Sequence, residues 1–218
     1  MSGVRTTLLS DGPSDRALLP ILRWLLIECG VRKAIHPQWA DLRQLRQPPR
    51  DMAERIHKTI ELYPCELLFI HRDAERDPAA KRREEIQEAV ERAFGEGAVN
   101  PPAICVIPVR MMEAWLLFDR ACIRQAAGNR SERQTLELPP LSRLEALPDP
   151  KELLHQLLRE ASGLSGRRRR QFDTDRAVHR LADLIEDFSP LRALNAFRSL
   201  EEDVHSLTQL ARWDIPDQ

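Results

Sequence analysis

The sequence lacks the features that mark several common classes of protein. No apolar run approaches the ~20 residues that cross a bilayer, and the first residues lack the apolar core of a signal peptide. The four cysteines are scattered singly, without a C-x-x-C pair, which argues against a zinc site and against a disulfide framework. The net charge is −1, so no overall basic field attracts nucleic acid. We therefore expect a cytoplasmic protein without membrane association.

The sequence does contain short apolar segments that alternate with amphipathic ones. Strands are predicted for four segments: residues 4–10, 33–39, 65–73 and 103–109. Helices are predicted after them: residues 14–29 with Ser14 as the N-cap, residues 50–62, a segment starting at Asp77-Pro78, and residues 111–119. This alternation predicts an α/β fold, with a parallel sheet of about four strands flanked by helices.

The second part of the chain has a different pattern. Prolines are frequent between residues 128 and 150, and Asp149-Pro150-Lys151-Glu152 is a strong helix start. Further amphipathic helices are predicted near residues 175–187 and 190–212. We therefore predict an α/β domain over residues 1–120 and a mainly helical C-terminal region, residues 121–218, packed on it.

Acidic residues follow three of the predicted strands. Asp11 and Asp15 come after the first, Asp73 and Glu75 end the third, and Glu113 follows the fourth. Ligands of parallel α/β sheets bind beyond the carboxyl ends of the strands, where these side chains would meet. Clustered carboxylates repel each other unless a cation lies among them. Mg²⁺ or Mn²⁺ would suit such oxygen ligands and would serve phosphoryl chemistry.

Each acid also has a simpler interpretation. Asp11 and Asp15 suit a turn and the first turn of a helix, where carboxylates favour the helix dipole. Asp73 and Glu75 suit a solvated loop, whereas Glu113 lies among apolar residues and needs a partner. Two readings also stay open for a nearby histidine. His71 precedes Asp73 and either reaches the metal or a phosphate, or has a structural role.

Two acidic motifs resemble those of Toprim-domain proteins, which include topoisomerases, bacterial primases and the overcoming-lysogenization-defect (OLD) nucleases. The family has an acidic turn after its first strand and D-x-D after its third. Here the first motif reads Asp11-Gly12-Pro13-Ser14-Asp15 and the second reads Asp73-Ala74-Glu75. The resemblance implies a Toprim-like, Rossmann-like sheet.

A closer resemblance is to a prokaryotic Toprim-like family often encoded beside ATPases in mobile or defence loci. Its P-x-x-x-x-E-A-W-L-L-x-D segment is matched by Pro108, by residues 113–117 and by Asp119. Its D-P-K helix start is matched by residues 149–151. Together the matches span residues 8 to about 155. This resemblance implies a nucleic-acid substrate and an ATPase partner, and it leaves a homo-oligomer open.

The resemblance also implies roles for individual residues. Asp11 matches the catalytic glutamate, as general acid/base or bridging ligand, and Lys151 matches a basic residue that stabilises transition-state charge in OLD-type nucleases. Asp73 is implied to be both catalytic and metal-binding. The other implied metal ligands are Asp11, Asp15, Glu75 and Glu113. Asp11 is shorter than the family glutamate and Glu75 longer than the family aspartate, and a ~1 Å displacement can cost ~10²-fold in rate.

A run of four arginines has two interpretations. It either contacts a phosphate backbone or forms a solvated helix end paired with Asp173 and Asp175; its members are Arg167, Arg168, Arg169 and Arg170.

From all these features we predict a Mg²⁺- or Mn²⁺-dependent Toprim nuclease that hydrolyses DNA or RNA. The alternative is a non-catalytic Toprim module that binds a partner protein or nucleic acid. A receiver-like domain fits less well, because the acid spacing and the long helical tail differ from that design.

Overall fold

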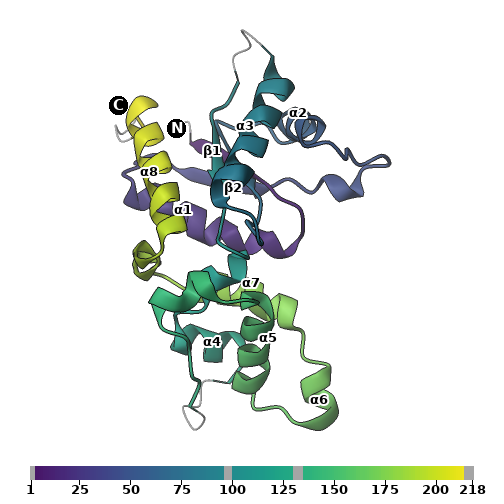
Figure 1. The fold of residues 1–218 in the computed structure, drawn as a ribbon, viewed down its shortest axis with the longest axis vertical. Helices are drawn as coiled ribbons and strands as arrows, with labels where there is room; N and C mark the ends of the chain where they lie inside the picture. Colours follow the sequence, from purple (N-terminus) through teal and green to yellow (C-terminus); the bar gives the residue numbers. More distant parts are fainter. Residues whose placement is uncertain (1–2, 96–99, 130–134, 214–218) are drawn as a thin grey trace.

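Four parallel strands form the centre of the computed structural model, which describes residues 3–95, 100–129 and 135–213 (Figure 1). The strands are β1 (Val4–Leu9), β2 (Ile35–Trp39), β3 (Leu67–His71) and β4 (Ala103–Val106). Their order in the sheet is β2-β1-β3-β4, and every neighbouring pair is parallel. The predicted α/β fold with a four-stranded parallel sheet is thus confirmed, although the strands are shorter than expected.

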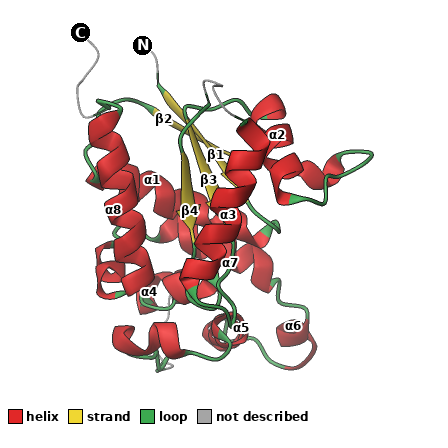
Figure 2. Ribbon diagram, turned by 45° about the horizontal axis from the view of Figure 1, so that its top comes forward, coloured by secondary structure: helices red, strands yellow, loops and turns green. Residues whose placement is uncertain are grey.

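Helices cover both faces of the sheet (Figure 2). In β3, Leu67 and Phe69 belong to the core that includes α1 (Leu18–Glu28) and α8 (Asn195–Leu210). The alternate residues Leu68 and Ile70 belong to a second core with α2 (Met52–Leu62) and α3 (Ala79–Phe94). Because both faces are covered, β3 is buried along its whole length, as is typical of parallel sheets.

The C-terminal helices share the larger core with the sheet. Helices α4 (Arg120–Ala126), α5 (Pro150–Ala161), α6 (Gly166–Arg170) and α7 (Thr174–Leu184) gather beyond one end of the sheet, whereas α8 returns along α1 (Figure 1). One continuous apolar cluster runs from Val4 in β1 to Val204 in α8. In the described ranges, no helix combines the length and apolar character needed to span a membrane.

Short 3₁₀ helices connect the main elements. They are η1 (Ser14–Ala17), η2 (Leu42–Gln44), η3 (Met112–Leu116), η4 (Leu141–Ala146) and η5 (Ser189–Ala193). The helix predicted over residues 111–119 is present as the shorter 3₁₀ helix η3. It ends before Asp119, whose side chain caps α4 by accepting from the Cys122 N–H at 2.8 Å.

Of the two predicted side-chain caps at Asp149 and Ser14, one is confirmed. Asp149 accepts a hydrogen bond from the Glu152 N–H at 2.8 Å and so caps α5 as expected. The predicted cap at Ser14 is wrong. Its hydroxyl donates to the Asp15 carboxylate at 3.3 Å, and a 3₁₀ turn precedes the start of α1 at Leu18.

Candidate functional site

The strand order reverses between β1 and β3, the point at which open parallel sheets have a crevice. From β1 the chain crosses to β2 on one side and later enters β3 on the other, so the loops after β1 and β3 diverge. Such a switch point is the usual ligand site of an open parallel sheet. Asp15 lies in η1 after β1, His71 is the last residue of β3, and Asp73 follows two residues later.

The loops that follow β3 and β4 remain paired beyond the sheet. Backbone N–H groups in residues 72–75 donate to carbonyl groups in residues 106–110 at 3.0 to 3.2 Å. This extension brings the start of η3 beside Asp73, and the Met112 N–H donates to Asp73 Oδ1 at 3.0 Å. Asp73 and Glu113 therefore belong to the same corner of the fold, as the strand pattern predicts.

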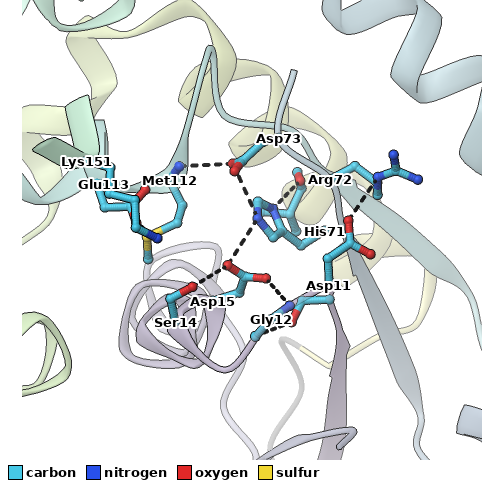
Figure 3. Close-up of polar contacts among 12 residues, drawn as sticks. Asp11, Gly12, Ser14, Asp15, His71, Arg72, Asp73, Met112, Glu113 and Lys151 are labelled. Atoms are coloured by element: carbon cyan, nitrogen blue, oxygen red, sulfur yellow. Dashed lines mark hydrogen bonds and ion pairs between the residues drawn. The ribbon is translucent and has the colours of Figure 1, made fainter. Parts of the chain in front are cut away.

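His71 lies between the two aspartates (Figure 3). Its Nδ1 is 2.9 Å from the carbonyl oxygen of Val106. A carbonyl only accepts hydrogen bonds, so Nδ1 carries a hydrogen and the ring orientation is fixed. The opposite nitrogen, Nε2, lies 3.4 Å from Asp73 Oδ1 and 3.9 Å from Asp15 Oδ1. Only 3 % of His71 is exposed, so its ring belongs to the interior of the site.

The turn after β1 orients the Asp15 carboxylate. The Gly12 N–H donates to Oδ2 at 2.9 Å and the Ser14 hydroxyl donates to Oδ1 at 3.3 Å. Asp15 is buried, which is unusual for an acid in a solvated turn. The turn therefore holds a charged group in the crevice at a fixed position.

The pKa of the Asp73 carboxyl group is shifted by its burial and by its charged neighbours. Burial raises the pKa of its carboxyl group to about 6, and the negative charges of Glu113 and Asp15 act in the same direction. His71 and the hydrogen bond from Met112 act against this rise but do not cancel it. A further positive charge at this point would favour the ionised form of Asp73.

A lysine from the helical region completes the cluster. Glu113 is buried, and its Oε1 lies 3.1 Å from Nζ of Lys151, in the first turn of α5 (Figure 3). Partial burial lowers the pKa of Lys151, but Glu113, with smaller effects of Asp175 and Asp15, raises it above its usual value. The corner thus combines three acids with His71 and Lys151, contributed by four separate segments.

The Glu113–Lys151 pair is expected to show strong coupling. Lys151→Met leaves a buried carboxylate without its partner, which should lower the free energy of unfolding by about 1 to 3 kcal/mol. Adding Glu113→Gln should restore most of that loss, because the unpaired charge is removed. Urea denaturation of the two single variants and the double variant, in chelator, measures the coupling. Strictly additive effects of the two substitutions would contradict this pairing.

Two of the predicted site residues lie outside the cluster. Asp11 points away from Asp15 (Figure 3) and forms ion pairs with Arg55 Nη1 at 2.5 Å and Arg72 Nε at 3.2 Å. Glu75 has a left-handed backbone (φ 53°), a largely exposed side chain and a 3.7 Å contact with Arg82. Their metal-binding and catalytic roles stay predictions, and in this geometry they lie at the rim of the crevice.

The four arginines form a separate exposed surface on α6. Arg167, Arg168, Arg169 and Arg170 are all exposed, and they have no ion pair with any residue that the structure describes. The alternative pairing with Asp173 and Asp175 is not seen. Asp173 caps α7 by accepting from the Arg176 N–H at 2.9 Å, and Asp175 Oδ1 lies 3.8 Å from His155 Nε2.

Sequence reasoning did not commit to His71 and missed Arg55. His71 had a usable signal, since it is the last residue of a buried strand and precedes an acid. Arg55 is 44 residues from Asp11 in the chain, and nothing in the spacing of α2 indicates that it reaches the turn after β1.

Two further findings bear on the site. Among the residues that the structure describes, no group of three or more His, Cys, Asp or Glu side chains is arranged so that it could hold a metal ion. Comparisons of the chain with protein-family models, with curated proteins and with solved structures found no match.

Proposed function

We propose that the chain is a divalent-cation-dependent phosphodiesterase that acts on nucleic acid, with Asp15, Asp73 and Glu113 around the cation. The observation that carries the proposal is the convergence of three acids, two of them deeply buried, at the switch point of the sheet. Acids in such a place are costly unless a cation or a substrate compensates them. The resemblance to Toprim proteins supports the same chemistry, and the ATPase partner and the defence setting rest on that resemblance alone.

The donor atoms are of the chemical type that suits Mg²⁺ or Mn²⁺, although the described side chains are not grouped around one ion in this geometry. The donors are carboxylate oxygens, which these hard cations prefer. Burial raises the pKa of Asp73, with Glu113 and Asp15 acting in the same direction, so a bound cation would favour its ionised form. A bound cation would supply an activated water and would stabilise charge on phosphate oxygens.

The remaining polar groups of the chain suit the substrate. Lys151 is partly exposed while its Nζ contacts Glu113, so it can donate to a phosphate oxygen at the edge of the cluster. The arginines of α6 offer four exposed guanidinium groups, which form no ion pair with the described part of the chain, for a phosphate backbone. Asp11 forms ion pairs with both Arg55 and Arg72. One carboxylate does not neutralise two guanidinium groups, so part of their positive charge remains for the substrate.

Cleavage assays test the proposal. The purified chain is incubated with plasmid DNA and with RNA in Mg²⁺ or Mn²⁺, alone and with an ATPase encoded beside it. We expect cation-dependent cleavage that Asp73→Ala abolishes, whereas Asp77→Ala in the same loop leaves it intact. The absence of cleavage in every combination, together with no measurable cation binding, would contradict the proposal.

The arginine surface gives a separate prediction for nucleic-acid binding. Replacing Arg167 to Arg170 with glutamine should weaken binding and make the slope of log K against log salt shallower by about 3 to 4, if each side chain contacts one phosphate. The matched control replaces all four with lysine, which keeps the charges and should keep the slope. Fluorescence anisotropy across a salt series measures both variants. An unchanged slope in the glutamine variant would place the phosphate contacts elsewhere.

The positions of Asp11 and Glu75 favour a second candidate function. Asp11 and Glu75, the two residues whose side-chain lengths depart from the Toprim pattern, are paired with arginines and lie outside the cluster. This supports a non-catalytic module that binds nucleic acid or a partner protein through the same crevice. Cation binding without cleavage of either nucleic acid is the result that this alternative predicts.

A further inference from the structure

We propose that Arg55 and Arg72 form a subsite for the terminal phosphate of a nucleic-acid strand, and that Asp11 fills this subsite until the phosphate displaces it. The proposal rests on the proposed function, because it takes nucleic acid as the ligand. It specifies the substrate class as strands that end in a phosphate monoester, at the 5′ or the 3′ end. No cation takes part in this subsite.

Asp11 holds the position of an anion between two guanidinium groups. Its Oδ1 lies 2.5 Å from Arg55 Nη1, and its Oδ2 lies 3.2 Å from Arg72 Nε (Figure 3). Arg55 belongs to α2 and Arg72 follows β3, so two separate elements supply donors to one point. Guanidinium groups bind phosphate oxygens in the same way as carboxylate oxygens. The Asp11 carboxylate therefore marks a position that suits a phosphate.

The Arg55 guanidinium is held in place independently of Asp11. Its Nη2 donates to the Ser10 carbonyl at 2.6 Å, and its side chain is only 17 % exposed. The Asp11 side chain, in contrast, is 54 % exposed. Because an ion pair with a solvent-exposed carboxylate is weak, Asp11 can turn into water while Arg55 keeps its position. The subsite is thus preorganised for another anion.

A cavity of 200 Å³ borders this position and leaves room for a ligand. Asp11 and Arg55 line it, as does Arg50, which is exposed and forms no ion pair with any residue in the described ranges. Arg43 also lines the cavity, but its Nε lies 2.8 Å from Asp41, which neutralises its charge. Arg50 is therefore a third guanidinium group that can contact an anion in the place of Asp11.

The charges favour a terminal phosphate over an internal phosphodiester. Arg50, Arg55 and Arg72 are all positive, against the single negative charge of Asp11. An internal phosphodiester also carries one negative charge and would gain little over the carboxylate that it replaces. A terminal phosphate carries about 1.5 to 2 negative charges and offers three acceptor oxygens. We therefore expect the subsite to select strand ends.

The subsite lies beside the acids of the candidate site. Asp11 precedes Gly12, whose N–H donates to Asp15 Oδ2 at 2.9 Å, so one short turn contains both the phosphate position and an acid of the cluster. Cleavage is then expected close to the phosphorylated end of the strand.

Binding of short single strands to the full chain in chelator tests the proposal. Strands of one sequence, as DNA and as RNA, have a 5′-phosphate, a 3′-phosphate or hydroxyl groups at both ends, and fluorescence anisotropy is measured from an internal label. We expect at least one phosphorylated strand to bind about 10-fold or more tightly than the hydroxyl strand. This preference should be lost in Arg55→Gln and in Arg72→Gln. Asp11→Asn should bind the preferred strand about 3-fold or more tightly than the wild type, because the competing carboxylate is gone.

The matched control is Arg83→Gln, because Arg83 also pairs with an aspartate of another element, Asp203 at 2.8 Å, but joins α3 to α8. This variant should keep the preference. Equal binding of all strands by the wild type would overturn the subsite and leave the proposed function to the cleavage assay. A preference that survives Arg72→Gln would also overturn the subsite.

An Asp11→Asn protein without a gain in affinity would overturn the displacement of Asp11, and this variant decides even if Arg55→Gln does not fold. Absence of binding of every strand to the wild type would overturn both the subsite and the proposed function. A clear preference for phosphorylated ends without cleavage in any cation would overturn the proposed catalysis alone.

Discussion

Replacing Asp73 with asparagine is expected to stabilise the protein against unfolding in chelator at pH 7.5, by about 1 to 3 kcal/mol. The substitution keeps an oxygen that can accept the Met112 hydrogen bond. It removes a charge that burial and the neighbouring Glu113 and Asp15 disfavour. For a chain of this size, such a gain corresponds to a rise of about 2 to 12 °C in the thermal midpoint.

The sign of the pH dependence follows from the pKa of Asp73. Burial, with help from the nearby acids, raises it to about 6 in the folded protein, against about 3.9 in an unfolded chain. Between pH 4 and 6 the folded state therefore binds more protons, and the free energy of unfolding falls as the pH rises. The advantage of Asp73→Asn should be largest above pH 6 and should vanish near pH 4.

Thermal melts of the wild type and Asp73→Asn between pH 4 and 8 measure this effect. Asp77→Asn is the matched control, because Asp77 lies in the same loop but pairs with Arg82 and Lys81 near the surface. It should not stabilise the protein at any pH. A destabilised Asp73→Asn protein at pH 7.5 would show that the ionised carboxylate is well compensated without a metal.

Phe197→Ala is expected to produce the largest loss of stability, about 3 to 5 kcal/mol. Phe197 is fully buried in α8 and lies between two tryptophans: its ring centroid is 5.4 Å from that of Trp115 and 6.3 Å from that of Trp24. Trp24 belongs to α1 and Trp115 to η3, so one phenylalanine joins the C-terminal helix to α1 and to the segment that carries Glu113.

Urea denaturation followed by tryptophan fluorescence measures the loss. Leu210→Ala is the control, because Leu210 is in the same helix but is 82 % exposed, and its removal should change stability by less than about 0.5 kcal/mol. We expect one transition for the whole chain, since a single core includes residues from both regions. A Phe197→Ala loss similar to that of the control would contradict this packing.

The sequence predicted the sheet because its local signals agree with the final packing. Residues 65–73 read as a strand buried on both faces, and Leu67 to Ile70 do alternate between two cores. Asp149 caps α5 because capping depends on a few neighbouring residues. The predicted cap at Ser14 is wrong because its hydroxyl donates to the Asp15 carboxylate instead, and the first turn is a 3₁₀ helix.

The sequence predicts which residues lie at the strand ends of the site, but it does not predict the partners of their side chains. Parallel strands bring Asp15, Asp73 and the start of η3 to one edge, and the pattern of strands contains that information. Whether Asp11 turns inward depends on Arg55 and Arg72, which reach it from α2 and from the loop after β3. The outward position of Glu75 depends on its left-handed backbone, which the residue type disfavours.

Equilibrium binding of Mg²⁺ and Mn²⁺ to the full chain, measured by calorimetry at pH 7.5, tests the central claim most directly. The account predicts saturable binding to one site in the wild type, its loss in an Asp15→Asn/Asp73→Asn double variant, and its retention in Asp77→Asn. Absence of binding to the wild type, or undiminished binding to the double variant, would contradict the account of this crevice as a cation site.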